Sequence, residues 1–212
     1  MINFDNKSIL DFGGSSGTVT WAGFGNILEY KDDIRWTGHN IIDPKDYTCI
    51  DVDKNAMDRG REKYPDAEWI YYNRYNPMYN PNGQKNLLPR VNKKYDLIYS
   101  YGVFGHTTYE ELLEFIDFFK TILTENGQIW LSIPCHGDQV IDWFYDKRIK
   151  QYSECDNIFE KPESYIYLID NKIKKEVPIE CKYLVTIYNK KFLTSLGEVI
   201  TVHFPQSFLK II

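Results

Sequence analysis

Seven short apolar runs, separated by polar stretches, dominate the hydrophobic pattern of the chain. Each has about the length of a β-strand and is rich in β-branched or aromatic side chains. The runs occupy residues 7–12, 47–52, 67–72, 95–100, 127–133, 198–204 and 207–212. Only Pro205 and Gln206 separate the last two runs. These two runs therefore predict an antiparallel hairpin.

Two of the polar stretches carry apolar residues at helical spacing. Residues 53–67 do so at Ala56, Met57, Gly60 and Tyr64. In residues 107–127, Thr108 and Glu111 form a capping-box pattern, and residues 126–127 supply a helix stop. The apolar stripe of this second helix consists of Leu112, Phe115, Ile116, Phe119, Ile122 and Leu123.

Strands that alternate with helices predict an α/β fold with a doubly wound, Rossmann-like sheet. We expect seven strands, mostly parallel with an antiparallel C-terminal strand, in a single domain over residues 1–212. Three segments are longer than this alternation needs and are interpreted as insertions: about 18–46, 74–94 and 135–191. The last contains a predicted hairpin turning at residues 170–172, and we expect it to cap a substrate site.

Composition and charge narrow the classes of partner. The chain has 25 Lys and Arg against 30 Asp and Glu, a net charge of -5, which argues against nucleic acid as a partner. Its four cysteines show no metal-binding spacing, so we expect free thiols, a reducing compartment and no metal. No segment reads as a signal peptide or approaches the roughly 20 apolar residues of a membrane span. The sequence therefore predicts a cytoplasmic protein that does not enter membranes.

The candidate ligand-binding and catalytic residues follow the ends of the predicted parallel strands. These ends share one edge of an open α/β sheet. Asp11 ends the first run, and the glycines after it let backbone approach a ligand closely. Asp51 ends the second run and can accept both hydroxyl hydrogens of a ribose; alternatively it caps the next helix, a role we assign to Asp53. Asn73 follows the third run and either pairs with an adenine edge or forms its own turn. The later runs are followed by Tyr101, His106, Cys135, His136 and Asp138.

Four stretches, taken in order, resemble the class I S-adenosylmethionine-dependent methyltransferases. They read ILDFGGSSG, CIDVDKNAMDRGREKYPDAEWIYYNRYN, YDLIYSYGVFGHTTYEELLEFIDFFKTIL and NGQIWLSIP. The DFGG turn and the YNRYN segment resemble in particular a loosely characterised bacterial branch. The resemblance runs from about residue 7 to 134 and resumes weakly in residues 198–212. It implies methyltransferase activity with S-adenosylmethionine as the cofactor.

The resemblance implies that the turn after the first strand cradles the methionine part of the cofactor. Asp11, Gly13 and Gly17 match the acid and the outer glycines of the family's first motif, with Gly14 inside the turn. Ser15 departs from the pattern, because it stands where the family has its central glycine. If this position needs a positive φ, serine is strained there by about 1 kcal/mol.

The resemblance also implies roles at the other strand ends. Asp51 matches the ribose acid, with Val52 alongside the adenine. Asn73 stands where the family more often has an aspartate that contacts the adenine amino group. Ser100 and Tyr101 match the segment that lines the methionine moiety.

A dehydrogenase is the main alternative enzyme, because it also uses a glycine turn and a later acid. Its fingerprint G-x-G-x-x-G is absent from this sequence. Asp11 instead precedes Gly13 by two residues, and the C-terminal hairpin is typical of methyltransferases. We therefore favour the methyltransferase.

Methyl transfer needs alignment of the acceptor with the methyl carbon and removal of a proton from a hydroxyl or ammonium. His106 is the first candidate base, because histidine exchanges protons near neutral pH, although it could instead pack beside the helix start. His136 is the second candidate or a solvated loop residue. Weaker candidates are Asp138, Tyr101 and Glu110. The aromatic cluster at residues 142–146 either walls an acceptor site or forms the core face of a helix.

The acceptor class is predicted mainly by exclusion. No DPPY-type sequence is present, and the chain is acidic, so DNA methylation is disfavoured. We expect transfer to an O or N atom of a small-molecule or sugar-like acceptor. A peptide or protein side chain is one alternative. A non-catalytic, cofactor-binding partner subunit is another, and Ser15 is the feature that favours it.

Overall fold

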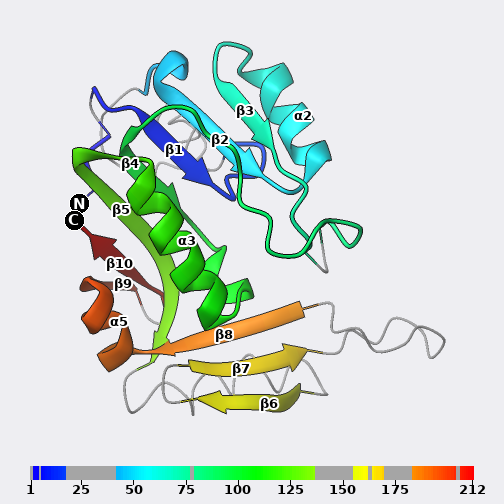
Figure 1. Ribbon diagram of the computed structural model, residues 1–212, viewed down its shortest axis with the longest axis vertical. Coiled ribbons are helices and arrows are strands. Elements are labelled where there is room, and N and C mark those ends of the chain that lie inside the picture. The colour runs from blue at the N-terminus through cyan, green and yellow to red at the C-terminus, as the bar shows by residue number, and fades with distance from the viewer. Residues whose placement is uncertain are drawn as a thin grey trace.

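A mixed β-sheet forms the centre of the protein (Figure 1). The computed structural model describes residues 2–4, 6–17, 42–76, 79–136, 155–161, 164–169, 183–203 and 206–212. Seven strands follow the order β3-β2-β1-β4-β5-β10-β9, and they correspond to the seven apolar runs. Neighbours from β3 to β5 are parallel, whereas β10 is antiparallel to β5 and β9. The predicted mixed sheet and terminal hairpin are confirmed. The strands are β1 (Ile9–Phe12), β2 (Tyr47–Asp51), β3 (Glu68–Tyr71), β4 (Tyr95–Ser100), β5 (Leu123–His136), β9 (Glu198–His203) and β10 (Gln206–Ile211).

The expected count of seven strands is wrong, because the third predicted insertion adds three more. These are β6 (Cys155–Lys161), β7 (Ser164–Ile169) and β8 (Tyr183–Asn189). Eight strands make a continuous path, β3-β2-β1-β4-β5-β8-β7-β6, from which β10 and β9 branch at β5. The added strands join because β5 is 14 residues long, and its last two residues pair in parallel with the end of β8. Both β6 and β8 pair antiparallel with β7. The turn predicted at residues 170–172 lies outside the described residues.

Two helices begin at the predicted capping residues. Helix α2 (Lys54–Lys63) starts after Asp53, whose side chain accepts a hydrogen bond from the Ala56 N–H at 3.1 Å. Helix α3 (Tyr109–Thr121) starts after Thr108, and both hydrogen bonds of the capping box with Glu111 are present. A short helix η4 (Phe104–His106) precedes α3, and η3 (Pro44–Asp46) precedes β2.

Helix α3 ends five residues before the predicted stop at residues 126–127. The Ile122 N–H bonds to the Phe119 carbonyl in a tight final turn. The chain then enters β5 at once, where Leu123 pairs with Tyr95 of β4 and the Thr124 hydroxyl donates to Asp96 at 2.9 Å. Pairing with the sheet therefore ends the helix before the Asn-Gly signal is reached.

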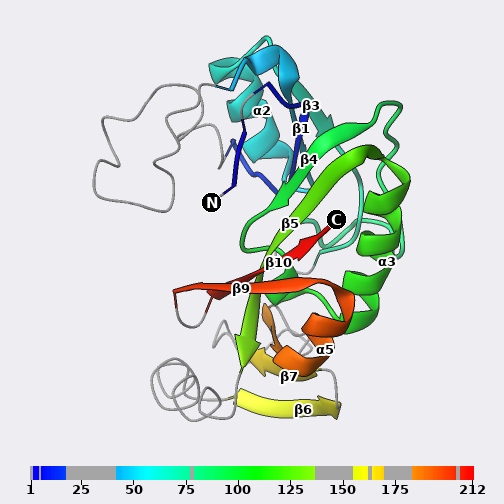
Figure 2. The same cartoon turned by 90° about the vertical axis from the view of Figure 1, so that its left-hand side faces the viewer.

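Helices α2 and α3 lie on opposite sides of the sheet (Figure 2). Alternate residues of each strand face one or the other, so Leu10 and Phe12 belong to the core cluster under α3, whereas Ile9 belongs to the cluster under α2. The buried residues of α3 are Leu112, Phe115, Ile116 and Phe119, as its apolar stripe predicts. Helices on both faces of the sheet are the predicted doubly wound arrangement. They leave the carboxyl ends of β1, β2 and β4 uncovered, and the candidate site lies there.

Helix α5 (Lys190–Leu196) was not predicted. It follows β8 directly, begins after the capping residue Asn189 and buries Leu193 against the sheet. With only seven residues, it carries too little apolar periodicity to be recognised from sequence. No helix among the described residues is long and apolar enough to cross a membrane.

Candidate active site

A cavity of about 720 Å³ opens at the carboxyl ends of β1, β2 and β4. Its volume lies within the roughly 300–1,000 Å³ of small-molecule sites. One side of the cavity is formed by the ends of β1 and β2, and another by η4 and the first turn of α3. Its lining includes Phe12, Gly13, Ser15, Asp51, Val52, Asp53, Tyr72, Arg74, Tyr75, Tyr79, Lys85, Tyr101, Val103, His106, Thr107, Glu111 and Phe115.

The turn after β1 packs closely against the loop after β4. Gly13 has a φ of +71°, and a Cβ at this position would lie 2.1 Å from Cγ2 of Val103. Its N–H donates to the Ile50 carbonyl at 2.7 Å, which fixes the turn beside the end of β2. A side chain at position 13 would therefore separate two of the segments that line the cavity.

Ser15 adopts the left-handed conformation that its place in the motif requires. Its φ is +54°, so the conditional prediction of strain at this position holds. The Ser15 N–H donates to Oδ2 of Asp51 at 2.8 Å. Despite the missing glycine, the turn still bonds to the acid at the end of β2.

Replacing Ser15 with Gly should stabilise the protein, because glycine relieves a left-handed conformation that costs a residue with a Cβ about 1 kcal/mol. For a chain of this size we expect a rise in Tm of roughly 2–4 °C. Thermal unfolding followed by circular dichroism measures it. Ser16→Gly is the matched control, since Ser16 is not among the positive-φ residues, and it should lower or leave the Tm unchanged. An equal rise in both variants would contradict strain at Ser15.

Asp51 combines burial with a place on the cavity lining. The residue is 8% exposed. Its Oδ1 accepts the Asp53 N–H at 2.8 Å, and its Oδ2 accepts that of Ser15. Burial raises the pKa of its carboxyl above the ordinary value, while these backbone donors act in the opposite direction. A carboxylate has about four lone-pair positions, so Asp51 keeps acceptor capacity for ligand hydroxyls.

Asp11 lies beneath the glycine turn instead of lining the cavity. It is 1% exposed, and its Oδ2 accepts the Tyr47 hydroxyl at 2.5 Å. A Cβ on Gly14 would lie 2.4 Å from the same oxygen. In this structure the acid supports the turn from below, and neither Gly14 nor Gly17 is part of the lining.

The other predicted cofactor residues divide into two groups. Val52 and Tyr101 line the cavity. Asn73 is exposed and outside the lining, and its Oδ1 accepts hydrogen bonds from Tyr71 and Asn80. Ser100 is fully buried outside the lining, and its hydroxyl has no hydrogen-bond partner among the described residues.

His106 is the candidate base that the structure brings to the cavity. It ends η4, is half-buried and lies next to Thr107 on the lining. His136 ends β5, where its backbone pairs with Asn189, and its side chain lies outside the described part of the chain. Asp138 and residues 142–146 also lie outside it. Glu110 is exposed on the first turn of α3 and is not part of the lining.

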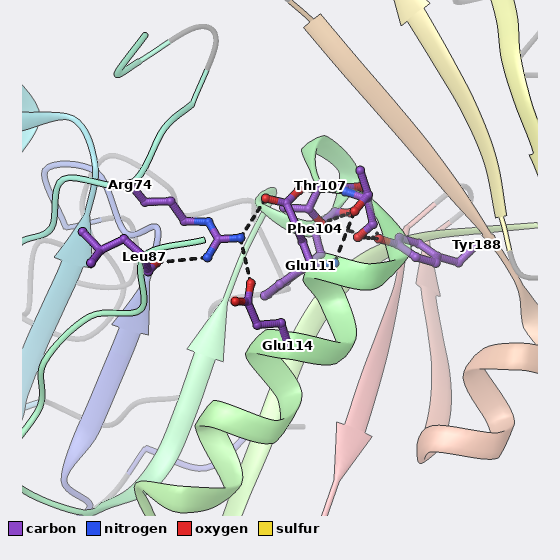
Figure 3. A network of polar contacts seen from close by, with 8 residues as sticks. Arg74, Leu87, Phe104, Thr107, Glu111, Glu114 and Tyr188 are labelled. Atoms are coloured by element: carbon purple, nitrogen blue, oxygen red, sulfur yellow. Dashed lines mark hydrogen bonds and ion pairs between the residues drawn. The ribbon is translucent and has the colours of Figure 1, made fainter. Parts of the chain in front are cut away.

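Sequence reasoning missed the buried charge cluster beside the cavity. Arg74 is 4% exposed and forms ion pairs with Glu111 at 2.9 Å and Glu114 at 2.8 Å (Figure 3). Arg74 stands inside the YNRYN segment, and Glu111 was recognised only as a capping residue. The spacing of acids on α3 indicates a shared helix face, but only the fold shows that Arg74 meets it.

Hydrogen bonds also connect the added strands to the cavity edge. The Thr186 hydroxyl on β8 donates to the Thr107 carbonyl. The Tyr188 hydroxyl, also on β8, lies 3.4 Å from the Thr107 carbonyl (Figure 3) and 3.3 Å from the Thr108 carbonyl. The inserted sheet is thereby fixed to the segment that carries His106.

A doubly wound sheet with a small-molecule cavity at its strand ends defines a ligand-binding α/β domain, the type of fold that serves many cofactor enzymes. The model of one family, described as the methyltransferase domain, matches residues 2–163. The chain belongs to this methyltransferase family and is an enzyme of that class. A comparison with curated proteins gave no significant match.

Solved structures share the fold along nearly the whole chain. The PH0226 protein from Pyrococcus horikoshii OT3 has a TM-score of 0.55 at 14% identity, covering 96% of this chain and 80% of that one. An S-adenosylmethionine-dependent methyltransferase from Clostridium acetobutylicum ATCC 824 has a TM-score of 0.53 at 11% identity, covering 99% and 84%. The DhpI-SAM-HEP complex has a TM-score of 0.50 at 12% identity, covering 95% and 76%.

Proposed function

We propose that this methyltransferase binds S-adenosylmethionine in the cavity and transfers its methyl group to an O or N atom of a small-molecule or sugar-like acceptor. The observation that carries the proposal is a single cavity that joins Asp51 and the glycine turn to His106. Nucleoside recognition and proton removal thus have candidate groups on the lining of one cavity.

The end of the cavity at β1 and β2 fits the cofactor. Phe12 of β1 pairs with Ile50 of β2, so the turn at residues 13–15 lies beside Asp51. Asp51 binds the ribose hydroxyls with its remaining lone pairs. Gly13 and Ser15 present backbone to the ligand at close range, because no bulky side chain intervenes.

The end of the cavity at η4 fits the acceptor. S-adenosylmethionine supplies a methyl group on a positively charged sulfur. As the acceptor atom forms its bond to the methyl carbon, the sulfur–carbon bond breaks and its electron pair stays on sulfur. His106 takes the proton that an acceptor hydroxyl or ammonium must release. The main task of the chain is alignment, which supplies a large share of the rate in such displacements.

The size of the cavity favours a small acceptor. A volume of about 720 Å³ falls within the range of sites that enclose most of a small ligand. The lining alternates aromatic rings with hydroxyl and charged groups, a combination that also suits sugar-like molecules. These features support the small-molecule acceptor over a peptide side chain.

Incubation with methyl-labelled S-adenosylmethionine tests the proposal. The purified protein is mixed with cell extract separated into a small-molecule fraction and a macromolecular fraction, and Asp51→Ala serves as the inactive control. We expect label in the small-molecule fraction. Label in protein would instead support the peptide acceptor. Cofactor binding without any transfer would support the partner subunit.

A further inference from the structure

Residues 75–85, with 77–78 outside the described residues, form one wall of the cavity, which we name the tyrosine wall. Its lining residues are Tyr75, Asn76, Tyr79 and Lys85. The wall is hydrogen-bonded to itself: the Tyr75 N–H donates to the Gln84 carbonyl at 2.9 Å, and Asn76 and Asn80 exchange backbone hydrogen bonds. It is therefore a compact unit whose described residues form neither a helix nor a strand.

The tyrosine wall follows β3 and lies next to the proposed nucleoside site. Tyr71, the last residue of β3, pairs with Asp51 at the end of β2. The Tyr72 N–H donates to the Asp51 carbonyl at 3.2 Å. The segment that leads into the wall is thus bonded to the end of the strand that carries Asp51, and the wall and Asp51 line the same cavity.

Arg74 reaches from the base of this wall across to α3 (Figure 3). Its Nη2 contacts Glu111 and Glu114, and its Nη1 donates to the Leu87 carbonyl at 3.0 Å. The guanidinium also lies over the Phe115 ring, 4.6 Å from its centroid. In turn, the Asn80 side chain donates to the Arg74 carbonyl at 3.0 Å. One residue therefore bonds both to the wall and to the opposite side of the cavity.

The contacts of Arg74 require the planar, branched guanidinium group of an arginine. Two carboxylates and one carbonyl accept from separate N–H groups of a planar guanidinium that also stacks on an aromatic ring. A lysine ammonium carries the charge but cannot hold these partners in the same geometry. Glu111 is itself fixed, because its second oxygen accepts the Thr108 N–H.

We propose that Arg74 is a positioning residue that holds the tyrosine wall against α3 and so preorganises the nucleoside end of the cavity; this inference rests on the proposed function. Without Arg74 the wall samples other arrangements. If the binding-competent arrangement is then populated one-tenth of the time, the apparent Kd rises about tenfold.

Titration with S-adenosylhomocysteine and, separately, with adenosine tests the inference. Arg74→Met should raise the Kd of both about tenfold, because the wall borders the nucleoside end. Arg74→Lys should recover part of the loss. Arg61→Met is the matched control, since it removes an arginine paired with Asp58 on α2, away from the lining, and it should leave both affinities unchanged.

Hydrogen exchange gives a readout that does not depend on the ligand. In Arg74→Met the amides of Asn80, Gly83 and Gln84 should exchange faster, while those of α2 stay unchanged. Wild-type affinity in Arg74→Met, or unchanged exchange in the wall, would overturn the inference. If Arg74→Met does not fold, Arg74→Lys and Glu114→Gln replace it with the same two readouts. Failure of the wild-type protein to bind either ligand would refute the proposed function, and exchange in the wall would still decide the role of Arg74.

Discussion

Replacing Asp51 with Ala is expected to raise the Kd for S-adenosylhomocysteine by on the order of 100-fold. A charged hydrogen bond contributes roughly 1.5–3 kcal/mol, and each 1.4 kcal/mol is a factor of ten in affinity. Asp51 is placed for two such bonds to ribose hydroxyls. Its loss also leaves the N–H groups of Ser15 and Asp53 without their acceptor, which loosens the turn that faces the cofactor.

Isothermal titration calorimetry measures this loss. Asp51→Asn keeps one acceptor oxygen and should fall between the wild type and Asp51→Ala. Asp117→Ala, on the exposed side of α3, is the control for removal of a negative charge and should bind normally. An affinity of Asp51→Ala within about threefold of the wild type, where two lost charged bonds predict on the order of 100-fold, would exclude Asp51 from ribose binding.

The second large effect is expected at His106, because a positioned general base contributes about 10²–10⁴-fold to a rate. His106→Ala should lower kcat by about that factor with the acceptor that the labelling experiment identifies. The Kd for S-adenosylhomocysteine should change little, since His106 lies at the η4 end of the cavity and Asp51 at the β2 end.

Activity across a range of pH separates a base from a packing residue. The residual activity of His106→Ala should depend on pH differently from the wild-type activity, because the group that takes the acceptor proton has been removed. His106→Gln keeps much of the volume of the side chain and controls for packing. Wild-type turnover in His106→Ala over the whole pH range would remove the base assignment from this residue.

The sheet and its helices could be predicted because their signals are local. Strand β4 was predicted at its observed bounds, and the Asp53 cap and the capping box of α3 are both formed. These features depend on apolar spacing and on hydrogen bonds between residues three positions apart. The resemblance also identified position 15 as one where a positive φ would strain serine, and the φ of Ser15 is +54°.

The features that the sequence did not predict are contacts between residues far apart in the chain. Arg74 meets Glu111 and Glu114 at separations of 37 and 40 residues, and no local pattern encodes that meeting. Asp11, predicted to cradle the methionine part of the cofactor, is 1% exposed and accepts a hydrogen bond from Tyr47, 36 residues away, a contact that no local pattern predicts. Position along a strand end places a residue near the site, whereas packing decides which way its side chain points.

The three added strands were missed for a related reason. The sequence showed one hairpin in residues 135–191 but not the pairing of β8 with the far end of β5. Strand β5 pairs with β8 because it extends to His136. The predicted run at residues 127–133 covered only the middle of this strand. The bonds from Thr186 and Tyr188 to the cavity edge follow from this pairing.

Calorimetric titration of the wild-type protein with S-adenosylhomocysteine tests the central claim most directly. Asp51, the glycine turn and the tyrosine wall line one cavity. We therefore expect saturable binding of one ligand per chain in the micromolar range, accompanied by a rise in Tm. Absence of both binding heat and any shift in Tm at saturating ligand would contradict the assignment of this cavity to the cofactor.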